Sequence, residues 1–144
     1  LSERGTFSWY ITRVLDTNSN YLNYAYVRDG NTGKTYLNQV DYTGNTGEQK
    51  GIALAPTHKV KFNLEDRTDK FSSYLSGSRI STEKLLKSIE VSINDKLVWL
   101  YELEYQPSND TQRSLLTSVT QKGFDQNNNP IALPVQSFEY QQAK

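Results

Sequence analysis

The sequence contains no cysteine and a single histidine, His58. Without cysteine the chain has no disulfide, no thiol nucleophile and no zinc site built on thiolates. Methionine is also absent, which indicates that the sequence does not start at an initiation codon. Its 144 residues are enough for one domain but hardly for two. We therefore expect a single domain over residues 1–144, whose N-terminus is either processed or the start of a segment excised from a longer protein.

Net charge and long apolar runs are lacking as well. Lys plus Arg and Asp plus Glu both number 16, so the formal charge is zero and gives no electrostatic reason to expect a nucleic acid or an anionic membrane as partner. The mean hydropathy of −0.71 argues against a transmembrane helix. The start, Leu1 to Arg4, lacks the apolar stretch of a signal peptide. We expect no nucleic-acid partner and no membrane insertion by this segment.

What the chain does have is a strong period of two, together with ten tyrosines, which suit half-buried sheet faces. Large side chains alternate with polar ones in three runs: His58, Val60, Phe62, Leu64; then Ile89, Val91, Ile93; then Leu97, Trp99, Tyr101, Leu103, Tyr105. Such alternation predicts strands with one apolar and one polar face.

Asn94 and Asp95 separate the second run from the third and predict a hairpin. A strict two-residue loop would place Val91 opposite Val98 and mix the two faces. A three-residue loop, Asn94 to Lys96, would pair Val91 with Trp99 and Ile89 with Tyr101 on one face, so we prefer the longer loop.

The remaining strand candidates are separated by turns rich in Gly, Asn and Asp. They are Thr6 to Leu15, Tyr21 to Arg28, Thr35 to Thr43, Phe71 to Leu75, Leu115 to Lys122 and Val135 to Gln141, with turns at 29–33, 43–47 and 125–130 and a loop or weak edge at 48–56. Residues 81–87 fit either a short helix capped by Ser81 or the start of the Ile89 strand, which we prefer. The fold class is all-β: an antiparallel meander of about eight to ten strands, forming a curved open sheet, a sandwich or a partial barrel.

Residues able to support chemistry are scattered. His58 has no second histidine or cysteine to share a metal ion, and we interpret it as a half-buried strand residue. Glu65, Asp66 and Asp69 could serve glycoside hydrolysis or bind calcium, but Arg67 among them favours a solvated turn with a local ion pair. Asp125 to Asn129 could also bind calcium, although with only one carboxylate. Ser76-Gly77-Ser78-Arg79 lacks the ending of a phosphate-binding loop and is typical of a turn or bulge. We predict no catalytic residue, no cofactor and no metal ligand.

Aromatic residues leave one alternative open. An exposed row could bind sugars by stacking, as in an adhesin-like or carbohydrate-binding module, although such rows in β proteins more often face a core. The candidates are Trp9, Trp99, Tyr24, Tyr26, Tyr101 and Tyr105.

A collinear series of motifs runs along most of the chain. It begins with Trp9-Tyr10-Ile11-Thr12-Arg13-Val14 and Asp16, followed by Asn20-Tyr21-Leu22-Asn23-Tyr24-Ala25-Tyr26. It continues in order through 36–45, 60–69, 74–79, 86–89, 97–105, 114–119 and 138–140. This series resembles the Rhs/YD-repeat proteins, in particular the N-terminal region of the Salmonella plasmid virulence B family and of the B component of insecticidal toxin complexes. Ser19 departs from the pattern, because the family usually has a turn glycine there, and Glu83-Lys84 stand near a position where a basic pair is common.

The resemblance implies a much larger secreted or surface-exposed bacterial protein whose strands wind into a hollow β-shell around a toxic C-terminal segment. Residues 1–144 would then be a single β domain excised from that protein, rather than a chain processed at its N-terminus. The segment in hand would contribute sheet wall and docking surface, would not itself be an enzyme, and would contact other domains of the same polypeptide or a toxin-complex subunit. Isolated from them, it would expose unpaired sheet edges, so a homodimer of the fragment is also expected.

Overall fold

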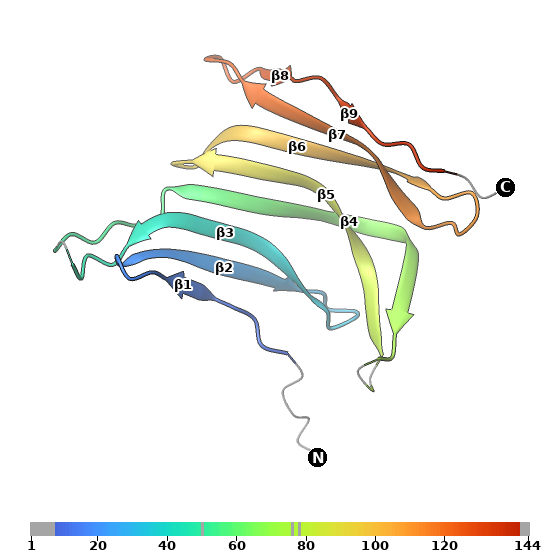
Figure 1. The fold of residues 1–144 in the computed structure, drawn as a ribbon, viewed down its shortest axis with the longest axis horizontal. Coiled ribbons are helices and arrows are strands. Elements are labelled where there is room, and N and C mark those ends of the chain that lie inside the picture. The colour runs from blue at the N-terminus through green and yellow to red at the C-terminus, as the bar shows by residue number, and fades with distance from the viewer. Residues whose placement is uncertain (1–7, 50, 76, 78, 142–144) are drawn as a thin grey trace.

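The computed structural model describes residues 8–49, 51–75, 77 and 79–141, and they form a single antiparallel sheet (Figure 1). The nine strands are β1 (Arg13–Leu15), β2 (Asn20–Arg28), β3 (Thr35–Asn45), β4 (His58–Ser73), β5 (Ile80–Ile93), β6 (Lys96–Pro107), β7 (Ser114–Phe124), β8 (Pro130–Ala132) and β9 (Gln136–Ser137). Strands β1 to β8 lie side by side in chain order, and β9 also pairs with β7. The expected all-β meander is confirmed, in its open form.

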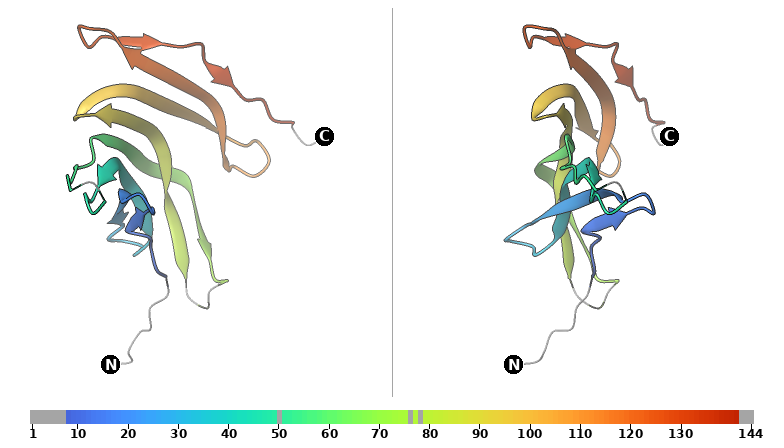
Figure 2. Two further views of the ribbon diagram at one scale, coloured as in Figure 1. Left: turned by 60° about the vertical axis from the view of Figure 1, so that its left-hand side comes forward. Right: turned by 90° about the vertical axis from the view of Figure 1, so that its left-hand side faces the viewer.

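The sheet is one layer thick. Figure 2 shows it curved and twisted, with no second layer over either face in the described part of the chain. Within that part no apolar side chain is fully buried, and the only buried polar residues are Ser19, Ser81 and Ser118. The chain exposes 10728 Å², whereas a compact monomer of its mass exposes about 7,500 Å². A half-buried apolar face therefore takes the place of a closed core.

The register of the hairpin between β5 and β6 depends on both its turn and a bulge in β6. The turn is the two-residue one, with Asn94 and Asp95 both at positive φ, 50° and 61°. Even so, Val91 pairs with Trp99 and Ile89 with Tyr101, because β6 shifts register by one residue between these pairs and the turn. The expected pairing is confirmed, and the expected three-residue loop is wrong, because a bulge rather than the loop supplies the extra residue.

Strands β4 and β5 form the longest hairpin, and its outer half turns away from the sheet (Figure 1). Their pairing shifts register near Asn63 and again between Asp66 and Phe71. The strand expected at Phe71–Leu75 is therefore the end of β4, not a separate element. Residues 81–87 belong to β5, which begins at Ile80, so the strand alternative is confirmed and the helix is wrong.

The strands at both ends of the sheet are shorter than the sequence predicted. The strand foreseen at Thr6–Leu15 is regular only from Arg13, while Thr6 lies outside the described residues. At the other end, Val135–Gln141 is a strand only at Gln136–Ser137, although Phe138 N still donates to Thr117 O. Strand β8 was missed because Pro130 reads as a turn residue. The sheet therefore ends in two short edge strands.

Two hairpin turns, at residues 16–20 and 125–129, share the same pattern of hydrogen bonds. In residues 16–20 the Asp16 carboxylate accepts hydrogen bonds from the backbone N–H groups of Asn18 and Asn20, both at 2.8 Å, and from the Asn20 side chain at 2.9 Å. In residues 125–129 the Asp125 carboxylate accepts the corresponding three bonds at 2.8, 2.8 and 3.0 Å. The fourth residue of each turn has positive φ, 65° at Ser19 and 64° at Asn128. Ser19 thus adopts the conformation that glycine prefers.

Candidate functional site

One face of the sheet carries the apolar side chains in rows that cross the strands. The cross-strand partners Tyr24, Val40, Val60, Val91 and Trp99 follow one another from β2 to β6. A second row contains Phe62, Ile89 and Tyr101, from β4 to β6. We call these eight residues the apolar face.

Each residue of the apolar face is half-buried by its neighbours except Trp99, which is 38% exposed. The Trp99 ring lies over Gly123, where an added Cβ would come within 3.2 Å of it. Nothing in the described residues packs against this face from above. A continuous apolar surface of this kind is typical of a sheet that contacts another protein layer.

The opposite face is polar, and many of its charges are paired. Lys122 Nζ lies 2.5 Å from Glu102 Oε2, and Asn63 Nδ2 donates to Glu90 Oε1 at 2.7 Å. Ser118 Oγ donates to Glu104 Oε2 at 2.9 Å. These pairs join neighbouring strands, so they hold the register of the sheet.

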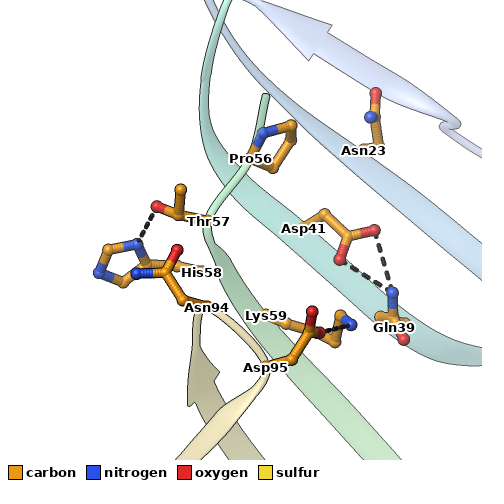
Figure 3. A pocket seen from close by; sticks show the side chains of 9 residues that line it. All are labelled: Asn23, Gln39, Asp41, Pro56, Thr57, His58, Lys59, Asn94 and Asp95. Carbon is orange, nitrogen blue, oxygen red and sulfur yellow. Dashed lines mark hydrogen bonds and ion pairs between the residues drawn. The ribbon is translucent and has the colours of Figure 1, made fainter. Parts of the chain in front are cut away.

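A polar hollow of about 400 Å³ lies where β3 and β4 meet the β5–β6 turn (Figure 3). In it Gln39 donates to both carboxylate oxygens of Asp41, at 2.8 and 3.0 Å, and Lys59 donates to Asp95 at 2.8 Å. The Asp95 carboxylate raises the pKa of Lys59, and Lys59 lowers the pKa of Asp95, so both stay charged. Its lining residues are Asn23, Gln39, Asp41, Pro56, Thr57, His58, Lys59, Asn94 and Asp95. The hollow is an open depression, and the charged groups of Asp41, Lys59 and Asp95 already have hydrogen-bond partners.

His58 lies at the rim of this hollow, with its ring directed away from Asp41 (Figure 3). The ring is 5.1 Å from that of Tyr42, and Nδ1 lies 3.0 Å from the hydroxyl of Thr57 and 3.2 Å from that of Thr43. The residue is half-buried on a strand, as the sequence predicted. Within the described ranges, no group of three His, Cys, Asp or Glu side chains is placed to hold a metal ion.

The acidic cluster at 65–69 is divided among different partners. Glu65 Oε2 accepts from Lys87 at 2.9 Å, and Asp66 Oδ1 accepts from Lys84 at 2.6 Å. Asp69 is bound by Arg67 at 2.9 Å, which confirms the local ion pair, although the cluster lies within strand β4 and not in a solvated turn. The structure therefore does not bring these carboxylates together as a pair facing one space.

Asp125 was the other calcium candidate. Its two oxygens accept hydrogen bonds from Asn127 and Asn129, and those from Asn129 lower its pKa most. This carboxylate closes its own turn. Of the serine motif, Ser76 and Ser78 lie outside the described residues, and Gly77 has a φ of 76°, as expected of a turn.

Sequence reasoning missed a contact between the bent β4 strand and β7. The Asp69 carboxylate accepts from Ser114 N at 3.0 Å and from Ser114 Oγ at 2.6 Å. The guanidinium of Arg113 lies 4.6 Å from the ring of Phe71, and that of Arg67 lies 5.1 Å from it. Sequence offers no signal for this contact, because 45 residues separate Asp69 from Ser114.

The aromatic candidates fall on different parts of the sheet. Trp9 is 84% exposed beside the β1 edge, whereas Trp99 belongs to the apolar face. Tyr26 lies 5.0 Å from Tyr10, and its hydroxyl donates to Ile11 O at 2.8 Å. Tyr105 donates to Leu86 O at 2.8 Å. The six aromatic residues do not form one continuous row. No helix long and apolar enough to span a membrane occurs in the described residues.

Comparison with known proteins finds similarity in fold but not in sequence. No protein-family profile matches the chain, and no curated protein sequence matches it. Among solved structures, it is similar to the N-terminal domain of the effector protein SpvB from Salmonella typhimurium strain LT2, with a TM-score of 0.64 and 15% sequence identity. The match covers 81% of this chain and 51% of that one, so the chain spans about half the length of the structure it matches. At this identity the likeness shows a shared fold, and it agrees loosely with the virulence-B resemblance of the sequence.

Proposed function

We propose that the chain is a non-catalytic structural module of an Rhs-like or toxin-complex-B-like bacterial surface or secreted protein, in which it forms part of a β-shell or a docking surface. The observation that carries this proposal is the single open layer with its apolar face uncovered. The fold shared with an effector domain agrees with it.

The apolar face supports a role as a wall. A sheet with one apolar and one polar face is stable when a second layer covers the apolar side. Here the polar face carries cross-strand pairs such as Lys122 with Glu102, which suit contact with water. The apolar face would meet other domains of the same polypeptide or a toxin-complex subunit. The residues would work by burial and strand pairing, not by reaction chemistry.

The distribution of chemical groups supports a non-catalytic role. His58 contacts hydroxyls, Glu65 and Asp66 are held by lysines, and Asp125 closes a turn. A general acid–base pair needs two such groups directed at one substrate position. On this proposal the module has no cofactor and no metal ion, binds no nucleic acid, does not insert into a membrane, and acts outside the cell or at the bacterial surface as part of a larger protein.

The coding sequence on both sides of this segment tests the proposal. We expect propeller-type repeats and a long YD-repeat tract downstream. A stop codon directly after Lys144, with only a signal peptide upstream, would contradict it.

A second candidate is a carbohydrate-binding or adhesin-like module, favoured by the 84% exposure of Trp9. Stacking of a sugar on the indole would change its fluorescence. Titration with a panel of glycans should give a saturable change that the Trp9→Ala variant loses and the Trp99→Phe variant keeps. No change with any glycan would contradict this candidate.

A further inference from the structure

We propose that the β1 edge is a self-association surface, at which a second copy of this chain pairs antiparallel across a twofold axis at Thr12. This inference goes beyond the proposed structural role and stands independently of it. It rests on the direction of backbone groups at the two ends of the sheet and on the side chains that flank them.

The hydrogen bonds between β1 and β2 fix which backbone groups of β1 point outward. Tyr24 N donates to Thr12 O at 2.9 Å, and Asp16 N donates to Asn20 O at 2.9 Å. Since bonding alternates along an antiparallel pair, Thr12, Val14 and Asp16 direct their backbone groups toward β2. The N–H and C=O groups of Arg13 and Leu15 therefore point away from the sheet.

The opposite end of the sheet, at β8, is blocked by proline against the addition of a further strand. Leu133 N donates to Gln121 O at 2.8 Å, so Leu133 directs its backbone toward β7, as does Ile131 two residues earlier. Of the outward positions beside them, 130 and 134 are proline, and only Ala132 between them has an N–H. Proline has no N–H to offer and is a common guard of sheet edges. A further strand is disfavoured there.

The free stretch of β4 is guarded by charge instead of proline. Strand β3 pairs with β4 only from His58 to Lys61, and beyond that β4 carries charges at five positions: Glu65, Asp66, Arg67, Asp69 and Lys70. The β1 edge has neither guard, since residues 8–16 contain no proline and only Arg13 and Asp16 are charged. Because the same edge of two copies would pair across a twofold axis, the product would be a closed dimer and not an open-ended fibre.

Exposed apolar side chains gather along this open edge. Trp9 is 84% exposed, Tyr10 46%, Ile11 59%, Val14 43% and Leu15 50%. Together they could remove on the order of 500 Å² per copy from water, below the roughly 800 Å² per partner of a standard interface. The dimer should therefore be weak and should depend on concentration.

Charge and pairing select the register. A twofold axis at Arg13 would put two guanidinium groups opposite each other. An axis at Thr12 instead places Arg13 of one copy opposite Ile11 of the other, Tyr10 opposite Val14, and Trp9 opposite Leu15. Ile11 O would then accept from Arg13 N of the second copy in addition to the bond it accepts from the Tyr26 hydroxyl. Aromatic side chains then face aliphatic ones, a favourable cross-strand combination. The two Thr12 residues meet as a non-hydrogen-bonded pair, with Cα atoms about 4.5 Å apart.

A cysteine substitution tests this geometry, because the natural chain contains no cysteine. The Thr12→Cys variant should form a disulfide-linked dimer under mild oxidation, since the Cα separation at the axis falls within the disulfide range of about 4.4–6.8 Å. The matched control is Gln126→Cys, at an exposed turn position at the blocked end. Equal cross-linking of the two variants at equal concentration would overturn the proposal.

Charge substitutions at the same position give a second, reversible readout. By sedimentation velocity the wild-type chain should shift from monomer to dimer as concentration rises. Thr12→Lys and Thr12→Glu should each remain monomeric, and an equimolar mixture of the two should dimerise again. A wild-type chain that stays monomeric at millimolar concentration would overturn the inference, as would a dimer that neither substitution weakens, which would indicate face-to-face association. Neither result would bear on the structural role proposed above.

Discussion

Asp69 on β4 and Ser114 on β7 are joined by two hydrogen bonds, although β5 and β6 lie between their strands in the sheet. The contact exists because the outer half of β4 bends back toward the start of β7 (Figure 1). The Asp69 side chain is only 6% exposed, and Arg67 binds the same carboxylate. This contact therefore holds the curvature of the sheet.

Replacing Asp69 should destabilise the fold much more than replacing an exposed acid. Asp69→Asn removes the ion pair with Arg67 and weakens the bonds from Ser114, which should lower the free energy of unfolding by about 1–3 kcal/mol. The control is Asp95→Asn, whose side chain is 86% exposed in its pair with Lys59 and should contribute little. Urea unfolding of both variants gives the comparison, and equal midpoints would contradict this role of Asp69.

The free energy of unfolding should decrease as the pH becomes acidic, in part because Asp69 is protonated. The bonds from Ser114, followed by those from Arg67, hold the pKa of Asp69 well below its ordinary value of 3.8. Because the folded pKa is the lower one, the carboxylate stabilises the fold fully above the unfolded pKa and loses that effect as the pH falls below it.

The stability difference between wild type and Asp69→Asn isolates this effect. Other carboxylates with lowered pKa values, such as Asp16 and Asp125, occur in both proteins and cancel in the difference. The difference in the free energy of unfolding between wild type and Asp69→Asn should be constant above about pH 5 and should decrease below that pH. Unfolding by urea at a series of pH values measures it, and a difference that grows with acid would show that the sign is wrong.

Gly44 should tolerate no side chain. The Tyr21 ring covers it from the neighbouring strand, so that an added Cβ would lie 2.4 Å from Tyr21 Cζ. The other face of the ring is covered by the Arg13 guanidinium at 4.0 Å. Gly44→Ala should cost about 1–3 kcal/mol by overpacking. The matched control is Gly30→Ala, which meets nothing within 4 Å, and thermal melts that rank the two variants equally would contradict this packing.

Ser19 occupies a turn position suited to glycine. Its φ of 65° is unfavourable for any residue with a Cβ, so Ser19→Gly should stabilise the protein by about 1 kcal/mol. Ser19→Ala keeps the backbone strain and should give no such gain. Melting temperatures separate the two, and a loss of stability in both variants would mean that the hydroxyl matters more than the backbone.

The sequence predicts this fold where alternation is strong. The rows through Val91 and Trp99, and through Ile89 and Tyr101, followed from keeping apolar side chains on one face. The family resemblance expects a turn glycine at position 19, and Ser19 there has a positive φ of 65°. The wrong predictions concern local backbone geometry. The bulge in β6 and the pairing of β8 beside Pro130 depend on geometry that residue types do not specify.

The site was harder to predict than the strands. Residue types at 65–69 indicated acids near an arginine, but nothing in the sequence indicated that Asp69 would reach Ser114. Unpaired sheet edges were expected, but the sequence did not identify β1 as the open edge, because the direction of backbone groups follows from the register and not from composition. In contrast, the interpretation of His58 as a half-buried strand residue needed only its place in the alternation.

The apolar face is uncovered in this chain, and on our proposal other parts of a larger protein cover it. Trp99, 38% exposed on that face, reports on it directly. In a Trp9→Phe background it is the remaining tryptophan, so acrylamide quenching of fluorescence measures its access to solvent. We predict ready quenching in the isolated chain and strong protection in the larger protein that the proposed function requires. Equal quenching in both would contradict the claim.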